Sequence, residues 1–155
     1  MTPSDTRLSR SSVEHLPTDE YFWTLMEPAW DDQSKATLGQ CILAKVTYFI
    51  RDVGNGGLEQ ALWNFDPTEV DFVIESLDQL GAMQHVALVR TGIRMLFGDS
   101  PPATLEERRT IIDARTRQWL DNHIEPLNEQ LYREESLWPY YRRYIEQHPL
   151  ESFRE

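Results

Sequence analysis

The sequence predicts an all-α fold, built as a single compact domain of six to eight helices with a glycine-rich joint between two central helices. Apolar residues recur at steps of three and four through several long segments, which is the period of a helix with one buried face. Capping residues, glycines and prolines separate these segments at plausible helix ends. No segment shows the alternation of apolar and polar residues that is typical of a half-buried strand.

The first part of the chain predicts a leader and two helices. Residues 1–17 are polar and rich in Ser and Thr, so we expect a flexible N-terminal leader before one helical domain over 18–155. Thr18 is expected to cap a short helix. Ser34 is expected to cap a long helix from Lys35 to about Val53.

The middle of the chain carries clear start and stop signals. After the joint, a short helix is expected from Leu58 to about Phe65. Asp66 as cap, Pro67 in the first turn and Glu69 shortly after predict the start of the next helix, which Gly81 should end. A further helix is expected over 83–97.

The last third predicts three more helical segments. Thr104 with Glu107 forms a capping box for a helix that should reach about His123, and Pro126 restarts the chain as a further helix. An aromatic-rich segment follows, from Trp138 to Ile145. The sequence leaves open whether this segment packs on the core or forms a dimer interface.

Composition bounds the class of protein. The chain has 155 residues, 40% of them hydrophobic, which is enough for a core that needs no disulfide or metal to stabilise it. Its single cysteine, Cys41, provides no disulfide framework, which favours a cytoplasmic location. No segment has the length of an apolar membrane span, so we expect no membrane association.

Catalytic and metal-binding patterns are not recognisable. The four histidines lie far apart in the chain, without the spacing of a metal site, and no nucleophile elbow is present. We therefore expect no enzymatic activity, no metal and no cofactor.

Charge is distributed unevenly along the chain. The formal net charge is −11, which argues against direct nucleic-acid binding and favours either a basic partner or simple solubility. Between Gly54 and Val89 there are six acidic residues and no Lys or Arg, whereas both flanks are nearly balanced. These six residues are the predicted partner-binding set: Glu59, Asp66, Glu69, Asp71, Glu75 and Asp78.

One predicted helix concentrates this charge. Asp71, Glu75 and Asp78 follow at steps of four and three, so they share one helix face. The five acids from Asp66 to Asp78 span roughly 18 Å, over which one side of a DNA duplex presents a comparable number of phosphates. The alternative is a solvated face that only keeps the domain soluble.

The glycine joint itself is interpreted as a structural corner. Its glycines permit positive φ, and Asn55 tolerates the left-handed region. The joint lacks the Lys-Ser/Thr ending of a phosphate loop. Gln60 and Asn64 are expected to satisfy backbone groups left unpaired by the turn. The residues of this structural motif are Asn55, Gly56, Gly57, Gln60, Asn64 and Gly81.

The pattern Asn-Gly-Gly-Leu-x-Gln-x-Leu-x-Asn over 55–64, followed by Leu-Gly-Ala over 80–82, resembles a known family. It is similar to the bacterial domain of unknown function 4375, whose best-characterised kind is a dimeric DNA-mimic protein. Leu58 stands where that family usually has Phe, and Ala61-Leu62 replaces an aromatic pair. The resemblance implies an all-α fold, no known enzymatic activity and an acidic surface that occupies the DNA-binding face of a transcription repressor. A homodimer is compatible with it.

Three functions fit these observations. The first is a non-enzymatic protein that binds a basic partner, such as a DNA-binding regulator, as a DNA mimic. The second is an immunity-type protein that neutralises a cationic toxin with the same acidic surface. The third is a small-ligand module or enzyme that uses a pocket near the joint, with Glu59, Gln60 and Asn64 as polar walls.

Overall fold

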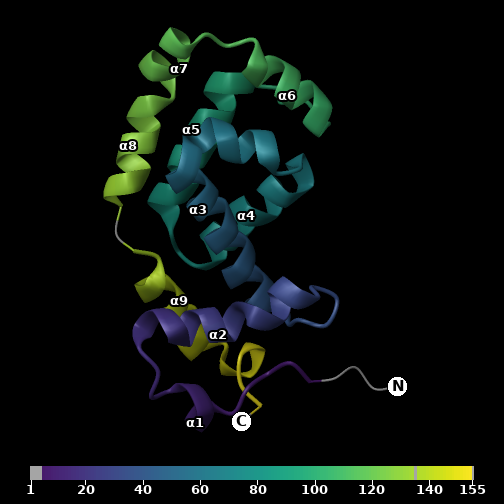
Figure 1. The fold of residues 1–155 in the computed structure, drawn as a ribbon, viewed down its shortest axis with the longest axis vertical. Coiled ribbons are helices and arrows are strands. Elements are labelled where there is room, and N and C mark those ends of the chain that lie inside the picture. Colours follow the sequence, from purple (N-terminus) through teal and green to yellow (C-terminus); the bar gives the residue numbers. More distant parts are fainter. Residues whose placement is uncertain (1–4, 135, 155) are drawn as a thin grey trace. The chain divides into compact units, whose positions relative to one another are not determined.

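The computed structural model describes residues 5–134 and 136–154, and these ranges are all-α, which confirms the predicted class. They contain nine α-helices and one 3-10 helix (Figure 1). The elements are α1 (Arg10–Val13), α2 (Thr18–Asp31), α3 (Leu38–Asn64), α4 (Pro67–Gln79), α5 (Met83–Phe97), α6 (Leu105–Asp113), α7 (Arg117–His123), α8 (Glu125–Arg133), α9 (Trp138–Gln147) and the 3-10 helix η1 (Pro149–Glu151). No described helix is both long and apolar enough to cross a membrane.

The chain divides into two compact units. Unit 1 comprises the segment up to Val46 and the segment from Ser136 onward, and unit 2 comprises Thr47–Glu135. Helix α3 begins in unit 1 and continues into unit 2. The expectation that 18–155 act as one domain stays a prediction.

Aromatic packing between α2 and α9 forms much of the interior of unit 1. The ring of Phe22 stacks on Trp138 with centroids 4.8 Å apart and meets Tyr141 edge-on at 5.8 Å. The indole Nε1 of Trp138 donates a hydrogen bond to Asp19 at 2.7 Å. Because Tyr141 and Tyr144 are buried as well, the C-terminal aromatic segment belongs to the core of this unit.

The predicted leader contributes to unit 1 in its described part. Residues 1–4 lie outside the described residues. The backbone of Leu8 donates to Ser152 at 3.0 Å and accepts from Arg154 at 3.1 Å, and Val13 in α1 is only 2% exposed. The leader is therefore bound to the C-terminal segment at Leu8, and the flexibility expected for residues 1–17 stays a prediction.

The long helix α3 begins later than expected. It starts at Leu38, not at Lys35, because Thr37 and Gln40 form a reciprocal capping box. The Gln40 backbone N–H donates to Thr37 Oγ1 at 3.1 Å, and the Thr37 N–H donates to Gln40 Oε1 at 3.0 Å. Ser34 instead hydrogen bonds to Asp32 through its own N–H and hydroxyl. The capping prediction for Ser34 was wrong.

Two other helix starts match their sequence signals. The Asp66 side chain caps α4 by accepting from the Thr68 N–H at 3.0 Å, with Pro67 in the first turn. Thr104 caps α6 by accepting from the Glu107 N–H at 3.3 Å. At α2 the N-cap is Pro17, and not Thr18 as expected. Thr18 is the first helical residue, and no side-chain hydrogen bond caps this helix.

The helix predicted from Thr104 to His123 is divided in two. Helix α6 ends at Asp113, and Thr116 then caps α7 by accepting from the Trp119 N–H at 3.1 Å. Because Thr116 caps a new helix so soon after α6 ends, α7 can take a different direction from α6.

Unit 2 is a group of helices around α5. Helix α5 packs against α4, α6 and α8, and α7 packs against α8 (Figure 1). The apolar residues that recur at steps of three and four in α4 and α5 are mostly buried, with Val73, Leu77 and Val89 at 0% exposure. The helical period in the sequence thus identified the buried faces correctly.

Replacing Thr37 by Ala tests the capping box of α3. The substitution removes the side-chain acceptor for the Gln40 N–H and the hydroxyl that donates to the Glu151 carbonyl. We therefore expect the free energy of unfolding to fall by about 1 kcal/mol or more. Urea denaturation followed by circular dichroism measures the change. Thr91→Ala is the control, because Thr91 lies within α5 and its hydroxyl only donates to the Ala87 carbonyl. Equal losses in the two variants would contradict the capping role.

Candidate functional site

The acidic ridge consists of Asp71, Glu75 and Asp78 on α4. All three side chains are exposed, and their spacing places them on one face of the helix. The opposite face of α4 is buried and apolar, with Val70, Val73, Ile74 and Leu77. The ridge is therefore an array of carboxylates on a helix that the core holds in place.

Asp66 and Glu69 lie at the start of the same helix and are half-buried. The Asp66 carboxylate accepts from both the N–H and the hydroxyl of Thr68, and these hydrogen bonds hold its pKa below the usual value. Asp66 thus has a structural task as a cap. Its charge still adds to the field at the N-terminal end of the ridge.

A buried arginine lies in the field of these acids and was not singled out from the sequence. Arg108 on α6 is 6% exposed, donates from Nε to the Pro102 carbonyl at 2.8 Å, and lies 5.2 Å from the centre of the Phe97 ring. Burial lowers the pKa of Arg108, while the negative charges of Asp71 and Asp66 raise it. This cation offsets part of the repulsion among carboxylates at one end of α4.

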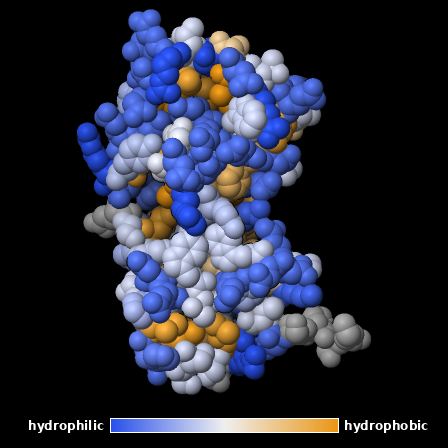
Figure 2. All heavy atoms as spheres, viewed as in Figure 1, coloured by the Kyte–Doolittle hydropathy of each residue, from blue (hydrophilic) through white to orange (hydrophobic). Residues whose placement is uncertain are grey.

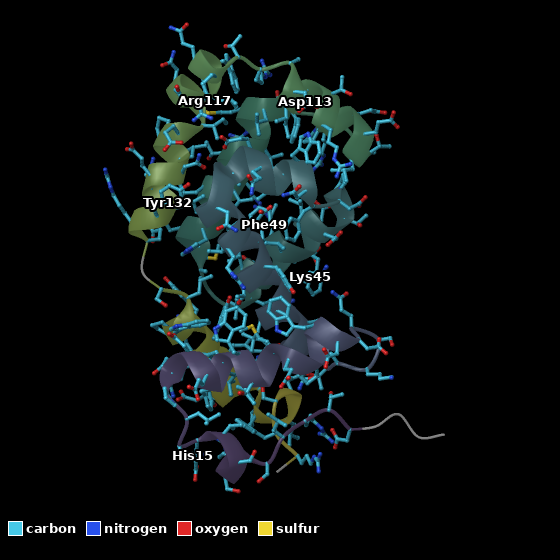
Figure 3. The ribbon with its side chains drawn as sticks, viewed as in Figure 1. His15, Lys45, Phe49, Asp113, Arg117 and Tyr132 are labelled. Carbon is cyan, nitrogen blue, oxygen red and sulfur yellow. The ribbon has the colours of Figure 1, made fainter. Side chains whose placement is uncertain are left out.

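Glu59 lies at the glycine joint, not on α4. Its carboxylate accepts a hydrogen bond at 3.2 Å from Asn128 Nδ2, which also donates to Glu125 at 3.1 Å. Tyr132, labelled on α8 in Figure 3, donates its hydroxyl to the Val53 carbonyl at 3.1 Å. The structure therefore divides the predicted binding residues between the acidic helix and the joint.

The joint is a kink within α3. Gly56 has φ −151° and ψ 17°, and Gly57 has φ 85° and ψ 171°, so neither residue is helical. A Cβ atom on Gly57 would lie 2.4 Å from Glu59 Oε2 and 2.6 Å from Asn128 Nδ2. Gly57 is thus required for its positive φ and for the close approach of these side chains. Asn55, in contrast, does not adopt positive φ.

A buried hydrogen bond completes the kink. The Leu58 N–H, which the break in the helix leaves without a partner along the chain, donates to Asn128 Oδ1 at 2.8 Å. Asn128 is only 1% exposed, and its amide links the joint to α8. Close packing supports the same corner, because a Cβ on Gly92 of α5 would lie 2.2 Å from Leu58 Cδ2.

The prediction that Gln60 and Asn64 bond to backbone groups at the joint was wrong. Their amides donate to the two carboxylate oxygens of Asp52, each at 2.8 Å. Asp52 precedes the kink and both amides follow it, so this carboxylate bridges the two halves of α3. Gly81, the last residue of the predicted motif, has φ 78° in the turn between α4 and α5.

The described residues contain no group of three or more His, Cys, Asp or Glu side chains that could hold a metal ion. Unit 1 has a hollow of about 330 Å³, lined by Glu27, Asp31 and Asp32 together with Thr6, Pro28 and Lys35. Another hollow in this unit, of about 150 Å³, is lined by residues that include Arg10 and Arg142. The polar pocket near the joint, expected for a ligand module, stays a prediction.

A family model described as DMP19-like protein matches residues 34–148, which include the kink, α4 and α8. The chain belongs to the DMP19-like protein family. No curated protein and no solved structure matches the chain. The relation to the domain of unknown function 4375 stays a prediction. The acidic ridge and the glycine joint of this DMP19-like protein both lie within the residues that the family model matches.

Substituting Gly57 by Ala tests the backbone requirement of the kink. Positive φ and the contacts with Glu59 and Asn128 should lower the free energy of unfolding by more than about 1 kcal/mol. Gly54→Ala is the matched control, because a Cβ there meets nothing within 4 Å and the residue is helical. This control should be neutral or stabilising by up to about 1 kcal/mol. Thermal unfolding of both variants measures the difference, and a destabilised control would contradict the interpretation.

Substituting Asn128 by Ala tests the buried hydrogen bond. The Leu58 N–H would lose its acceptor in a dry environment, which should cost about 1–3 kcal/mol of unfolding free energy. Asn122→Ala on α7 provides the control, since that side chain is exposed. Hydrogen exchange of the Leu58 amide should also accelerate in the Asn128 variant. Unchanged exchange at Leu58 would show that the kink does not depend on this bond.

Proposed function

We propose that this DMP19-like protein is a non-enzymatic protein that binds a basic partner through the acidic ridge, aided by Asp66 and Glu69. We further propose that it acts as a DNA mimic, occupying the DNA-binding surface of a transcription regulator or another DNA-binding protein. The observation that carries the proposal is the ridge itself. Three carboxylates project from one face of a helix whose other face is buried.

The charge of unit 2 supports this surface. Its sequence has sixteen acidic and eight basic residues, a net charge of −8, whereas unit 1 has ten and seven, a net charge of −3. Hydrophilic side chains dominate the face of the molecule drawn in Figure 2. A basic partner would therefore be attracted to unit 2 over a distance set by the Debye length, roughly 10 Å at 0.1 M salt.

The spacing of the carboxylates supports mimicry of a phosphate backbone. The acids from Asp66 to Asp78 are distributed over about 18 Å of helix, and the duplex places one charge per roughly 1.7 Å when both strands are counted. Only about half of those phosphates face one side. The charge density of α4 is therefore of the same order as one side of DNA.

The position of Glu59 makes it a secondary part of the surface. Its carboxylate is already a hydrogen-bond acceptor for Asn128. Engaging it with a partner would compete with that bond, whereas the ridge residues are exposed. We therefore assign the larger share of the binding free energy to Asp71, Glu75 and Asp78.

Charge reversal of the ridge tests the proposal. The triple variant Asp71→Lys, Glu75→Lys, Asp78→Lys should keep its melting temperature within a few degrees and lose its partner. The assay is an affinity pull-down at low salt, quantified by mass spectrometry. Binding by the unchanged protein should weaken steeply between low and moderate salt, because exposed charges dominate it.

A matched control distinguishes the effect of losing the ridge from the effect of changing the net charge of the protein. Glu20→Lys, Glu27→Lys, Asp31→Lys makes the same change on exposed residues of α2 and should retain the partner. A short DNA duplex should compete with the protein for the captured partner. Retention by the ridge variant would refute the surface assignment. A cationic toxin that is captured without competition from DNA would support the immunity-type function instead.

A further inference from the structure

Two exposed arginines lie on the helix next to the acidic ridge. Helices α4 and α5 are joined by the short turn 80–82 and pack against each other, so they form an antiparallel hairpin. Arg90 and Arg94 of α5 are exposed and four residues apart, which places them on one face of that helix. The hairpin therefore carries acidic groups on one helix and basic groups on the other.

Both groups of charges face away from the core. On α4 the ridge lies opposite the buried apolar face. On α5 the two arginines lie on the face opposite its buried residues, which are His85, Val86, Leu88, Val89, Gly92 and Leu96. Because the two helices of a packed hairpin share the core on one side, their exposed faces lie together on the other. The ridge and the arginines thus belong to one surface.

The turn fixes how far each charge lies along the hairpin. At about 1.5 Å per residue, Asp71 lies about 12 Å from the end of α4, and Arg90 lies about 10.5 Å from the start of α5, so the two are at a similar level. Arg94 lies about 16.5 Å from that start. Asp78, in contrast, lies close to the turn, where the segment 83–86 of α5 contains no Lys or Arg.

A buried cation adds to the same end of the hairpin. Arg108 is 6% exposed, and the charges that act on it are those of Asp71 and Asp66, at the N-terminal half of α4. Positive charge therefore accompanies the carboxylates at the Asp66 end of the surface. The end at Glu75 and Asp78 is negative, because those carboxylates make no ion pair with the described residues.

This uneven charge selects among partners. The side chains of Arg90 and Arg94 make no hydrogen bond and no ion pair with the described residues. A uniformly basic partner would be repelled there, whereas a partner with carboxylates beside its basic groups would be attracted at both ends. We propose that Arg90 and Arg94 orient the partner, a protein whose basic surface is bordered by acidic residues. Its basic groups lie at Glu75 and Asp78, and its acidic groups lie at the two arginines. This inference rests on the proposed function.

Two synthetic peptides test the selection. They share a run of lysines and differ only at one end, where the first has glutamates and the second has glutamines. Calorimetric titration of the full chain at low salt measures both affinities. The variant Arg90→Gln, Arg94→Gln should lower the affinity for the glutamate peptide, relative to the glutamine peptide, about fivefold, as expected for the loss of two exposed ion pairs.

A matched control removes the effect of net charge. Arg142→Gln, Arg143→Gln makes the same change of charge on exposed residues of α9 in unit 1. This control should leave the ratio of the two affinities as it is in the unchanged protein.

A spin label reports the orientation directly. With a nitroxide on the lysine end of the glutamate peptide, the NMR signals of amides near Asp78 should broaden more than those near Thr68. Equal broadening at both ends of α4, or a control that changes the affinity ratio as much as the Arg90 and Arg94 variant does, overturns the orientation. Binding of the glutamine peptide that is lost on charge reversal of the ridge would still support the proposed function in that case. If neither peptide binds, the proposed function and the orientation are both refuted.

Discussion

The hydrogen bond from the Leu58 N–H to Asn128 Oδ1 is the constraint on which the arrangement of unit 2 depends. A kink in a helix leaves backbone donors without acceptors, and a buried donor without a partner costs about as much as a lost hydrogen bond. Asn128 supplies the acceptor from α8, at 2.8 Å and out of contact with water. Gly57 and Gly92 then allow the close approach that this bond requires. The chain can therefore change direction at the joint and return as α4.

That change of direction gives the acidic helix its place. Asp52 holds the two halves of α3 by accepting from Gln60 and Asn64, and Asp66 caps the next helix directly afterwards. The carboxylates near the joint thus serve the fold, whereas those of the ridge are exposed. Residues that are equal in charge differ in function because of what surrounds them. The net charge of the chain does not distinguish the carboxylates near the joint from those of the ridge.

The sequence predicted most helix faces, since burial follows a period that can be read from the chain. Asp66 and Thr104 were recognised as caps because the acceptor and the donor lie two or three residues apart. The capping box of Thr37 and Gln40 carried the same signal, Thr-x-x-Gln, and could have been found. Asn128 could not, because its partner lies 70 residues away and no local pattern marks it. Arg108 was hidden for the same reason, as a buried cation has no sequence signature of its own.

The sequence by itself determined the all-α class, the kink at Gly56 and Gly57, and the shared face of Asp71, Glu75 and Asp78. Each of these depends on residues within a few turns of one another, where propensity and periodicity act. Only the tertiary structure decided that Gln60 and Asn64 bind a side chain, that Glu59 lies apart from the ridge, and that Arg10 and Arg142 line one hollow. The bonds of Gln60 and Asn64 depend on the geometry of the kink, which brings them to Asp52. The other two facts depend on contacts between segments far apart in the sequence, which are fixed by packing and by the need to satisfy buried polar groups.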